Sequence, residues 1–351
     1  MGYRRAMETT HRLAAGDARA LPLGSSSVHL VVTSPPYPLV SMWDDGFAVG
    51  APEVAAALAN ADGALAFETM HQQLDAAWAE CARVLVPGGW LAVNIGDAVR
   101  TLGGRFQRWP NAARITMAAM RLGLEPMPDL LWRKPTNAPN KFMGSGMLPG
   151  GAYVTYEHEY VLLFRAPGVR VQDPGLRRRS AYFWEERNLW FSDLWAGVTG
   201  ARQARAGGRE RSAAFPPELP WRLVQMYSAY GDVVLDPFGG TGTTALAALA
   251  SGRSSITVER DPSVLAEVPA ALREAVPWGR ARVAERAEAH RAFVAARTAA
   301  GKALAHQNVP HGWPVITRQE AELELWEPDA VGAIAEGVLA THRRFVPPWL
   351  V

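Results

Sequence analysis

The chain has 351 residues, of which 48% are hydrophobic, and its formal net charge is +2. This length allows a substantial buried core, and no run of about 18 apolar residues is present that would cross a bilayer. The single cysteine, Cys81, excludes an intramolecular disulfide and a cysteine-based zinc site, and the eight histidines lack metal-ligand spacing. The sequence therefore predicts a protein without a metal. Because the N-terminus lacks the apolar segment of a secretion signal, it also predicts a cytoplasmic location.

The first predicted element is a short buried strand that ends in a stiff turn. Residues 26–34 read SSVHLVVTS, an apolar and β-branched run, and two prolines and a tyrosine follow. Proline fixes its own φ and restricts the residue before it, so the tetrapeptide Ser34-Pro35-Pro36-Tyr37 is nearly rigid. A rigid turn at a strand end holds a few polar atoms and one aromatic ring in fixed positions, which points to a site.

The next stretch predicts helices and strands in alternation. Residues 38–65 predict a loop or a small helical insertion, and apolar residues then recur at helical spacing over 66–85. Gly88 and Gly89 are expected to stop that helix. Three strands follow, of which the last two are expected to be neighbours: 90–97, 130–134 and 157–165. This alternation predicts an α/β domain with a mostly parallel sheet.

A glycine-rich loop, LDPFGGTGTT at 235–244, lies between a predicted strand and a predicted helix. Its glycines let the backbone approach a ligand closely, and the loop leads directly into the N-terminus of the predicted helix. Glu259 ends the next strand, about 20 residues after the first glycine, where an acid in a nucleotide-binding βαβ unit accepts hydrogen bonds from ribose hydroxyls. The Gly-Lys-Ser/Thr ending of a P-loop is absent. The loop therefore predicts a nucleoside-type cofactor.

The two motifs together closely resemble the S-adenosylmethionine-dependent amino-methyltransferases of DNA. Their order, Ser-Pro-Pro-Tyr before the glycine loop, resembles the circularly permuted β group, and most of all the N4-cytosine methyltransferases of restriction–modification systems. The resemblance covers residues 10–262, and the last 90 or so residues depart from the family's short ending. Other matching segments are GDARALP at 16–22, VLVPGGWLAVNIGD at 84–97, WRKP at 132–135, HEYVLLF at 158–164 and FPPELP at 215–220.

The resemblance implies a Rossmann-like methyltransferase fold. Its mostly parallel sheet is expected to have seven strands with helices on both faces, together with an inserted recognition segment and a C-terminal helical extension. The implied division of the chain is a catalytic half at 10–165, a target-recognition region at 166–213, a cofactor-binding half at 214–262 and an extension of unknown role at 263–351.

The resemblance also implies a reaction, the methylation of the exocyclic amine of a base flipped out of double-stranded DNA. The Ser34 hydroxyl and the Pro35 carbonyl would accept hydrogen bonds from that amine, Pro36 would stiffen the turn, and Tyr37 would stack on the base. In the family, Ser-Pro-Pro-Tyr goes mostly with cytosine N4 and Asp-Pro-Pro-Tyr mostly with adenine N6. Ser34 therefore favours N4-cytosine, with N6-adenine as the alternative.

On the cofactor side, the resemblance places Phe238 against the adenine, with Phe215 and Pro216 on its other face. Asp236 would lie near the amino-acid part, and Glu259 would bind the ribose. Asp17 would accept from the adenine amine, or would be a solvated turn carboxylate. The full predicted cofactor site is Asp17, Thr33, Phe215, Pro216, Asp236, Pro237, Phe238, Gly239, Gly240, Thr241, Gly242, Thr243 and Glu259.

A basic stretch falls inside the predicted recognition region. From Arg177 to Arg211 the chain has eight arginines against four acids, interleaved with aromatic residues. This composition suits a nucleic-acid surface, although a solvated basic face over a small apolar cluster would have the same composition. The predicted DNA contacts are Lys134, Lys141, Arg177, Arg178, Arg179 and Arg187.

Three rival hypotheses remain open at this stage: an enzyme acting on RNA, a non-catalytic DNA-binding subunit, and two turns with only structural roles. Cofactor binding separates the enzyme from the non-catalytic alternatives. The partners expected of the enzyme are double-stranded DNA and a restriction endonuclease, with no membrane, and the chain is expected to be a monomer or a weak homodimer.

Overall fold

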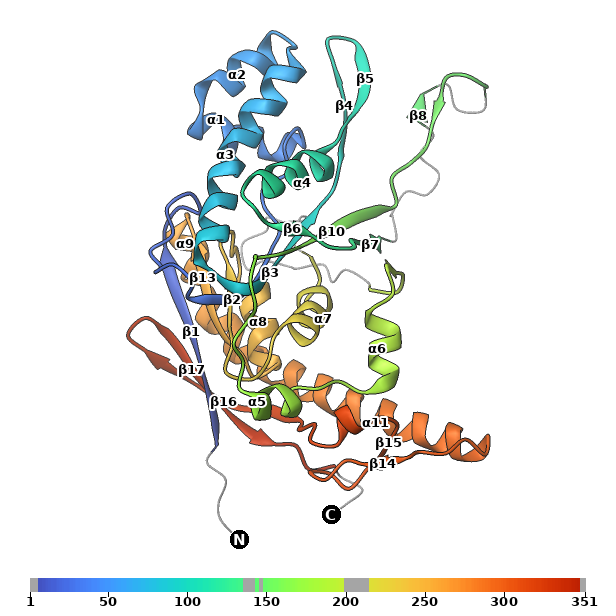
Figure 1. Ribbon diagram of the computed structural model, residues 1–351. Helices are drawn as coiled ribbons and strands as arrows, with labels where there is room; N and C mark the ends of the chain where they lie inside the picture. The colour runs from blue at the N-terminus through green and yellow to red at the C-terminus, as the bar shows by residue number, and fades with distance from the viewer. Residues whose placement is uncertain (1–5, 135–142, 145–147, 199–214, 348–351) are drawn as a thin grey trace.

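One large twisted sheet organises the chain (Figure 1). The computed structural model describes residues 6–134, 143–144, 148–198 and 215–347. In these residues the sheet has eleven strands, in the order β11-β7-β10-β3-β2-β12-β13-β1-β17-β16, with β6 paired to β10. The strands are β1 (Met7–Ala15), β2 (Val28–Thr33), β3 (Leu85–Ile95), β6 (Glu125–Pro126), β7 (Leu130–Arg133), β10 (His158–Arg165), β11 (Leu194–Trp195), β12 (Val233–Asp236), β13 (Ser254–Glu259), β16 (Trp326–Ile334) and β17 (Gly337–Arg344).

The centre of the sheet is parallel, as the sequence predicts for an α/β domain. Strands β3, β2, β12, β13 and β1 are paired in parallel, one after another. Antiparallel pairs enlarge the sheet at both sides, through β10 next to β3 and through β17 next to β1. The α/β fold is confirmed, and the sheet is larger than the seven strands expected because these flanking strands extend it.

Helices cover both faces of the sheet. Along β2, Val31 belongs to the core under α3 (Gly63–Val84) and α4 (Asn111–Arg121). Its neighbours Leu30 and Val32 belong to the core under α7 (Glu218–Tyr227) and α8 (Thr243–Ala250). Since side chains alternate between the two faces of a strand, a strand buried on both faces is apolar almost throughout, as β2 is.

The remaining helices and strands lie around the sheet and the four helices that cover its two faces. Residues 38–65, predicted as a loop or a small helical insertion, form three short helices: η1 (Ser41–Trp43), α1 (Asp44–Gly50) and α2 (Pro52–Ala59). The remaining helices are α5 (Pro174–Arg179), α6 (Trp184–Trp190), α9 (Pro262–Leu265), α10 (Val268–Glu274), α11 (Val276–Ala299) and η2 (Arg318–Glu320). Three small hairpins are β4 (Ala98–Leu102) with β5 (Arg105–Trp109), β8 (Met143–Gly144) with β9 (Ala152–Tyr153), and β14 (His306–Gln307) with β15 (Pro314–Val315).

The boundary between α3 and β3 differs from the one predicted. The helix ends at Val84 and the strand begins at Leu85, so Gly88 and Gly89 lie inside the strand and do not stop the helix. Gly88 has a φ of +71°, and a Cβ there would be 2.7 Å from the backbone nitrogen of Arg170. A glycine is therefore needed at this position for a close backbone approach.

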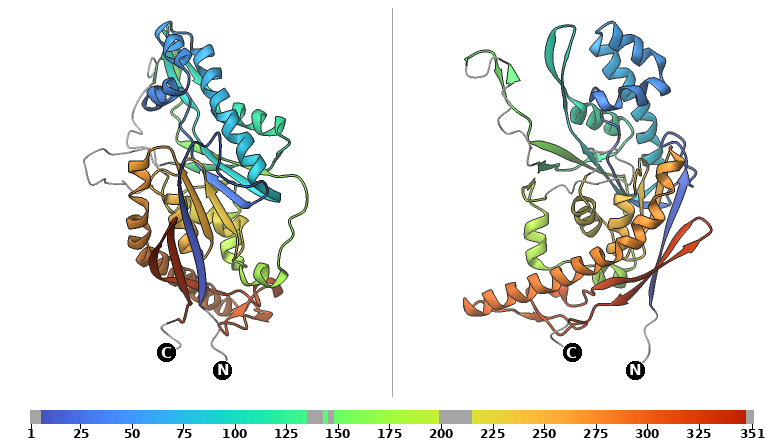
Figure 2. Two further views of the ribbon diagram at one scale, coloured as in Figure 1. Left: turned by 90° about the vertical axis from the view of Figure 1, so that its left-hand side faces the viewer. Right: turned by 180° about the vertical axis from the view of Figure 1, so that it is seen from behind.

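The C-terminal extension is only half helical, so the prediction of a helical extension is wrong for its second part. Helices α9, α10 and α11 are followed by a hairpin in which β17 pairs antiparallel with both β1 and β16. Val338 and Ala340 on β17 are buried in a core shared with α8 and α10. Figure 2 shows α11 crossing the molecule at the end opposite α1 and α2.

The extension is fastened to α6 by a buried ion pair. Arg286 on α11 donates to both carboxylate oxygens of Glu186, at 2.5 and 2.9 Å, and both side chains are more than nine-tenths buried. Beside the pair, the rings of Phe183 and His290 stack with centroids 4.0 Å apart. The segment before α6 and the extension thus share a small core of their own.

No helix in the described ranges is long and apolar enough to span a bilayer.

Glu186→Ala is expected to lower the free energy of unfolding by about 3–5 kcal/mol, because it leaves the Arg286 guanidinium buried without its partner. Urea denaturation of the purified chain measures the change. The matched control is Glu288→Ala on α11, where an exposed carboxylate pairs with Arg291, and its transition is expected to coincide with that of the wild type. Equal transitions for all three proteins would contradict the role given to the buried pair.

Candidate active site

Two sequence motifs far apart in the chain meet where strands β2 and β12 end. The strands are parallel neighbours, with Leu30 opposite Val234 and Val31 opposite Leu235. Their carboxyl ends therefore carry the Ser34 turn and the glycine loop to the same edge of the sheet, which is where α/β folds bind ligands. Thr33 Oγ1 donates to Asp236 Oδ1 at 2.7 Å, across 203 residues of sequence.

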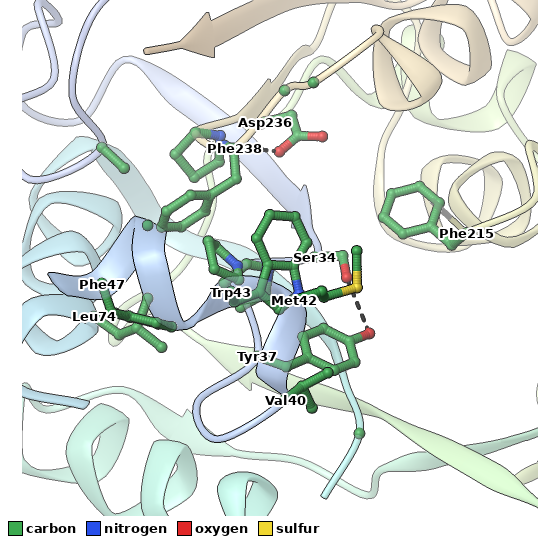
Figure 3. Close-up of a pocket in the computed structure, with 18 of the residues that line it drawn as sticks. Ser34, Tyr37, Val40, Met42, Trp43, Phe47, Leu74, Phe215, Asp236 and Phe238 are labelled. Atoms are coloured by element: carbon green, nitrogen blue, oxygen red, sulfur yellow. Dashed lines mark hydrogen bonds between the residues drawn. The ribbon is translucent and has the colours of Figure 1, made fainter. Parts of the chain in front are cut away.

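A cavity of about 730 Å³ opens between these motifs (Figure 3). Besides the two motifs it is bordered by the insertion after the turn, which contributes Val40, Met42, Trp43 and Phe47. In Figure 3, Phe238 and Phe215 lie on opposite sides of the cavity. Both rings are at least partly buried, so they offer apolar walls for a flat ring.

The glycine loop adopts a conformation that other residues would disturb. A Cβ at Gly239 would overlap the methyl group of Thr257, which is buried on β13. Gly240 and Gly242 have φ values of +51° and +86°, in the left-handed region. The Gly240 N–H donates to Glu259 Oε2 at 2.9 Å, so the loop and the acid at the end of β13 are held together.

Asp236 is a buried carboxylate at the end of β12, where this loop begins. It accepts hydrogen bonds from the hydroxyls of Thr33 and Thr244, at 2.7 and 2.8 Å, and from the Phe238 N–H at 3.1 Å. Burial raises the pKa of Asp236 to about 6, although the three hydrogen bonds oppose this increase. The side chain is therefore half ionised near pH 6 and loses its negative charge as the pH falls below that value.

Asp17 lies on the cavity wall and is paired with a neighbour. Arg19 donates to both of its carboxylate oxygens, at 2.7 to 3.1 Å. The hydrogen bonds from Arg19 lower the pKa of Asp17. Asp17 thus lines the cavity, as the resemblance implies, in the form of one member of an ion pair.

A hydrogen-bond network surrounds the hydroxyl of Tyr37. This hydroxyl donates to Glu159 Oε2 at 2.9 Å and accepts from Asn94 Nδ2 at 2.8 Å. Burial and the nearby Glu159 carboxylate raise the pKa of Tyr37 well above its ordinary value, so the phenol stays protonated. The other oxygen of Glu159 accepts from Lys134 Nζ at 2.5 Å.

This network sets the orientation of the Ser34 hydroxyl. Ser34 Oγ lies 3.1 Å from the Tyr37 oxygen, a contact in which either group has a proton to donate. The single phenolic proton of Tyr37 is committed to Glu159, so Ser34 is the donor. The lone pairs of Ser34 Oγ then remain available to accept a hydrogen bond from a group in the cavity.

The structure brings most of the predicted site residues to one cavity. Thr33, Pro216 and Gly242 do not line it. Glu159 and Asn94 were missed as site residues, and the only sequence signals for them were the HEYVLLF and VNIGD segments that contain them. The predicted residues that line the cavity are Asp17, Ser34, Pro35, Pro36, Tyr37, Lys134, Phe215, Asp236, Pro237, Phe238, Gly239, Gly240, Thr241, Thr243 and Glu259.

Helix α5, which carries Arg177, Arg178 and Arg179, lies at the other end of the sheet. The Tyr230 N–H, just before β12 begins, donates to Ser180 Oγ at the end of α5, at 2.7 Å. The opposite end of β12 opens into the cavity, and Figure 1 shows α5 well away from α1 and α2. The position of α5 gives no support to the prediction that these arginines contact DNA beside the site.

Ion pairs engage two of these arginines. Arg178 pairs with Glu322 at 2.8 Å, and Arg179 lies 3.6 Å from Glu324, both acids belonging to the C-terminal extension. Arg187 is exposed on α6. Lys141, the remaining predicted DNA contact, lies outside the described residues, as do residues 199–214 of the basic stretch.

The described part of the chain contains no group of three or more His, Cys, Asp or Glu residues that could hold a metal ion.

Comparisons with known proteins identify the family. The N6/N4 methyltransferase family model, described as DNA methylase, matches residues 28–268. The chain is 43% identical over 330 residues to the Type II methyltransferase M.MthZI of Methanothermobacter thermautotrophicus, with 92% of each chain covered. It is 44% identical over 271 residues to the Type II methyltransferase M.MjaI of Methanocaldococcus jannaschii, covering 73% of this chain and 89% of that one.

Solved structures agree in fold. A DNA modification methylase from Thermus thermophilus, complexed with S-adenosyl-L-methionine and itself assigned only by inference, is 33% identical with a TM-score of 0.60, over 76% of this chain and 95% of that one. The cytosine-N4-specific PvuII DNA methyltransferase is 20% identical with a TM-score of 0.52, over 74% of this chain and 86% of that one, a likeness of fold. The Rossmann-like methyltransferase fold is thereby confirmed.

Proposed function

The chain belongs to the DNA methylase family of N6 and N4 methyltransferases, and we propose that it methylates the N4 amine of a flipped-out cytosine in double-stranded DNA, with S-adenosylmethionine as methyl donor. One observation carries this proposal: the Ser34 turn and the glycine loop border a single cavity. The cavity lies within the usual size range of ligand pockets, about 300–1,000 Å³.

The residues of the glycine-loop side fit a nucleoside-type methyl donor. The donor supplies a methyl group activated on a sulfonium. Glu259 keeps carboxylate lone pairs for ribose hydroxyls while it accepts from the Gly240 N–H. Phe238 and Phe215 provide apolar walls for the adenine, and the Asp236 carboxylate attracts the α-ammonium group of the amino-acid end.

The residues of the turn fit an aromatic amine as the methyl acceptor. The lone pair of such an amine is delocalised into the ring, so the amine is a poor nucleophile. Acceptors for its N–H groups localise the lone pair and draw the proton away. We infer that Ser34 Oγ, whose lone pairs are free, and the Pro35 carbonyl serve as these acceptors, since both residues line the cavity and a stiff turn holds them without reorganisation.

The choice of cytosine rests on the first residue of the turn. Ser34 occupies the position that in the family goes mostly with cytosine N4. The amine of adenine has the same chemistry, and the acceptors described above would serve it equally well. The Type II methyltransferases that resemble this chain support a role in restriction–modification beside a partner endonuclease.

The direct test is methylation of genomic DNA from a host without modification, followed by sequencing that separates N4-methylcytosine from N6-methyladenine. N4-methylcytosine at one short sequence is expected, and Ser34→Ala is expected to lower the initial rate by about tenfold or more, the worth of one hydrogen bond. N6-methyladenine would overturn the choice of base. Absence of methylation by a wild-type chain that binds the cofactor would overturn DNA as the substrate.

Glu159→Gln tests how the Tyr37 network prepares Ser34. An amide at position 159 can donate to the Tyr37 oxygen, which frees the phenolic proton to occupy a lone pair of Ser34. A fall in kcat of about tenfold is expected, with little change in cofactor Kd, because one hydrogen bond to the reacting amine is weakened. Glu125→Gln, which removes an exposed ion pair with Arg165 on the neighbouring strand, is the matched control. Equal kcat values for the two variants would contradict the role of Glu159.

A further inference from the structure

The hairpin β4–β5 follows directly in sequence after residues that line the rim of the cavity. Gly96 and Asp97 line the cavity, and the hairpin begins at the next residue, Ala98, and returns at Trp109. Figures 1 and 2 show it projecting beyond the sheet, beside α1 and α2 on one side and the β8–β9 hairpin on the other. A ligand too large to enter the cavity would therefore meet this hairpin first.

The hairpin is basic throughout. Residues 98–109 include three arginines and no aspartate or glutamate. Arg105 is exposed and its side chain forms no ion pair within the described residues. Arg108 is 54% exposed and lies 3.7 Å from Asp97 on the rim. The third, Arg100, is held by Asp44 of α1 at 2.8 to 2.9 Å, so it anchors the hairpin.

Packing on both sides makes the hairpin rigid. Towards α3, Trp109 and Leu102 lie so close to Gly63 that any Cβ there would collide with them. On the other side, the rings of Phe106 and Tyr153 stack with centroids 4.6 Å apart. A rigid support fixes the position of the exposed arginines before any partner arrives, which lowers the entropy cost of binding.

The tip of the hairpin is narrow. It consists of Gly103 and Gly104, with φ values of +56° and +75°, the positive values of the type I′ turn that joins tightly paired strands. No side chain projects from the tip itself. The cations stand instead behind it, Arg105 next to the turn and Arg108 nearer the rim of the cavity.

We propose that the β4–β5 hairpin is a duplex DNA contact, in which Arg105 and Arg108 bind backbone phosphates next to the flipped nucleotide. This inference rests on the proposed function, since it names the surface that holds the DNA at the same site. Flipping a base costs unstacking energy and requires the duplex to be held in register with the cavity, and phosphate contacts from arginine provide that positioning. The location of the hairpin meets this need, whereas the arginines of α5 lie at the far end of the sheet.

The test is the salt dependence of DNA binding by Arg105→Gln. Phosphate contacts do not depend on sequence, so an unmethylated duplex of about 30 base pairs serves, with affinity measured by fluorescence anisotropy at several salt concentrations. The variant is expected to bind about threefold to tenfold more weakly at low salt, and its slope of log affinity against log salt is expected to fall by about 1. Cofactor affinity is expected to stay at the wild-type value.

Two further variants complete the design. Arg105→Lys keeps the charge and is expected to retain the wild-type slope. Arg318→Gln removes an exposed arginine from η2 and is expected to bind like the wild type. If Arg105→Gln binds and methylates DNA like the wild type, or if Arg318→Gln shows an equal loss, the hairpin is not a DNA contact although the proposed function stands. If the wild type itself neither binds nor methylates DNA, both proposals fail.

Discussion

The hydrogen bond from Thr33 to Asp236 joins the two halves of the site. Thr33 is the last residue of β2, next to the turn, and Asp236 is the last residue of β12, next to the glycine loop. Because the two strands are parallel neighbours, the bond spans 203 residues of sequence and yet connects adjacent strand ends. In the proposed function it places the acceptors for the base and the carboxylate for the cofactor in one frame. The parallel strands at the centre of the sheet, and the helices that cover them, keep the ends of β2 and β12 next to each other.

The same arrangement explains how a serine hydroxyl is kept ready to accept. Tyr37 is held by Glu159 and Asn94, which come from the antiparallel pair β10 and β3 next to β2. Lys134, from the end of β7, completes the chain of hydrogen bonds. These strands lie on the side of the sheet away from the glycine loop. In the proposed function, the strands on one side of β2 therefore orient the methyl acceptor, while the strands on the other side hold the methyl donor.

The parts of the fold that could be predicted from the sequence are those with strong local signals. The strand at β2 is almost purely apolar because it is buried on both faces, and the glycine loop has conformations that only glycine adopts readily. The strand β1 went unnoticed, because its buried positions include Thr9 and His11, whose polar atoms are satisfied by each other and by Ser255. The hairpin β16–β17 was missed for a related reason, since most of β16 beyond its first three residues is exposed and carries no apolar pattern.

In the site, too, the residues that could be predicted are those with a strong local signal in the sequence. Ser34, Tyr37 and Glu259 stand in recognisable motifs, whereas Glu159 acts only through a contact between strands that no local pattern records. The DNA contacts expected at Arg177–Arg179 stay a prediction, because composition does not say which end of the sheet a helix occupies and α5 lies at the end opposite the cavity. Ion pairs with Glu322 and Glu324 use part of that charge to fasten the C-terminal extension.

The most direct test of the coupling between the two motifs is the pH dependence of S-adenosylmethionine affinity, measured calorimetrically for the wild type and for Thr33→Val. The pKa of Asp236 is raised to about 6, so its charge, and with it the attraction for the cationic cofactor, is lost as the pH falls through that value. Affinity is expected to be about tenfold weaker at pH 5 than at pH 7. Loss of the Thr33 hydrogen bond raises that pKa further, so the valine variant is expected to show its midpoint at higher pH, while Thr33→Ser matches the wild type. A flat profile in the wild type, or one midpoint for all three proteins, would contradict the account.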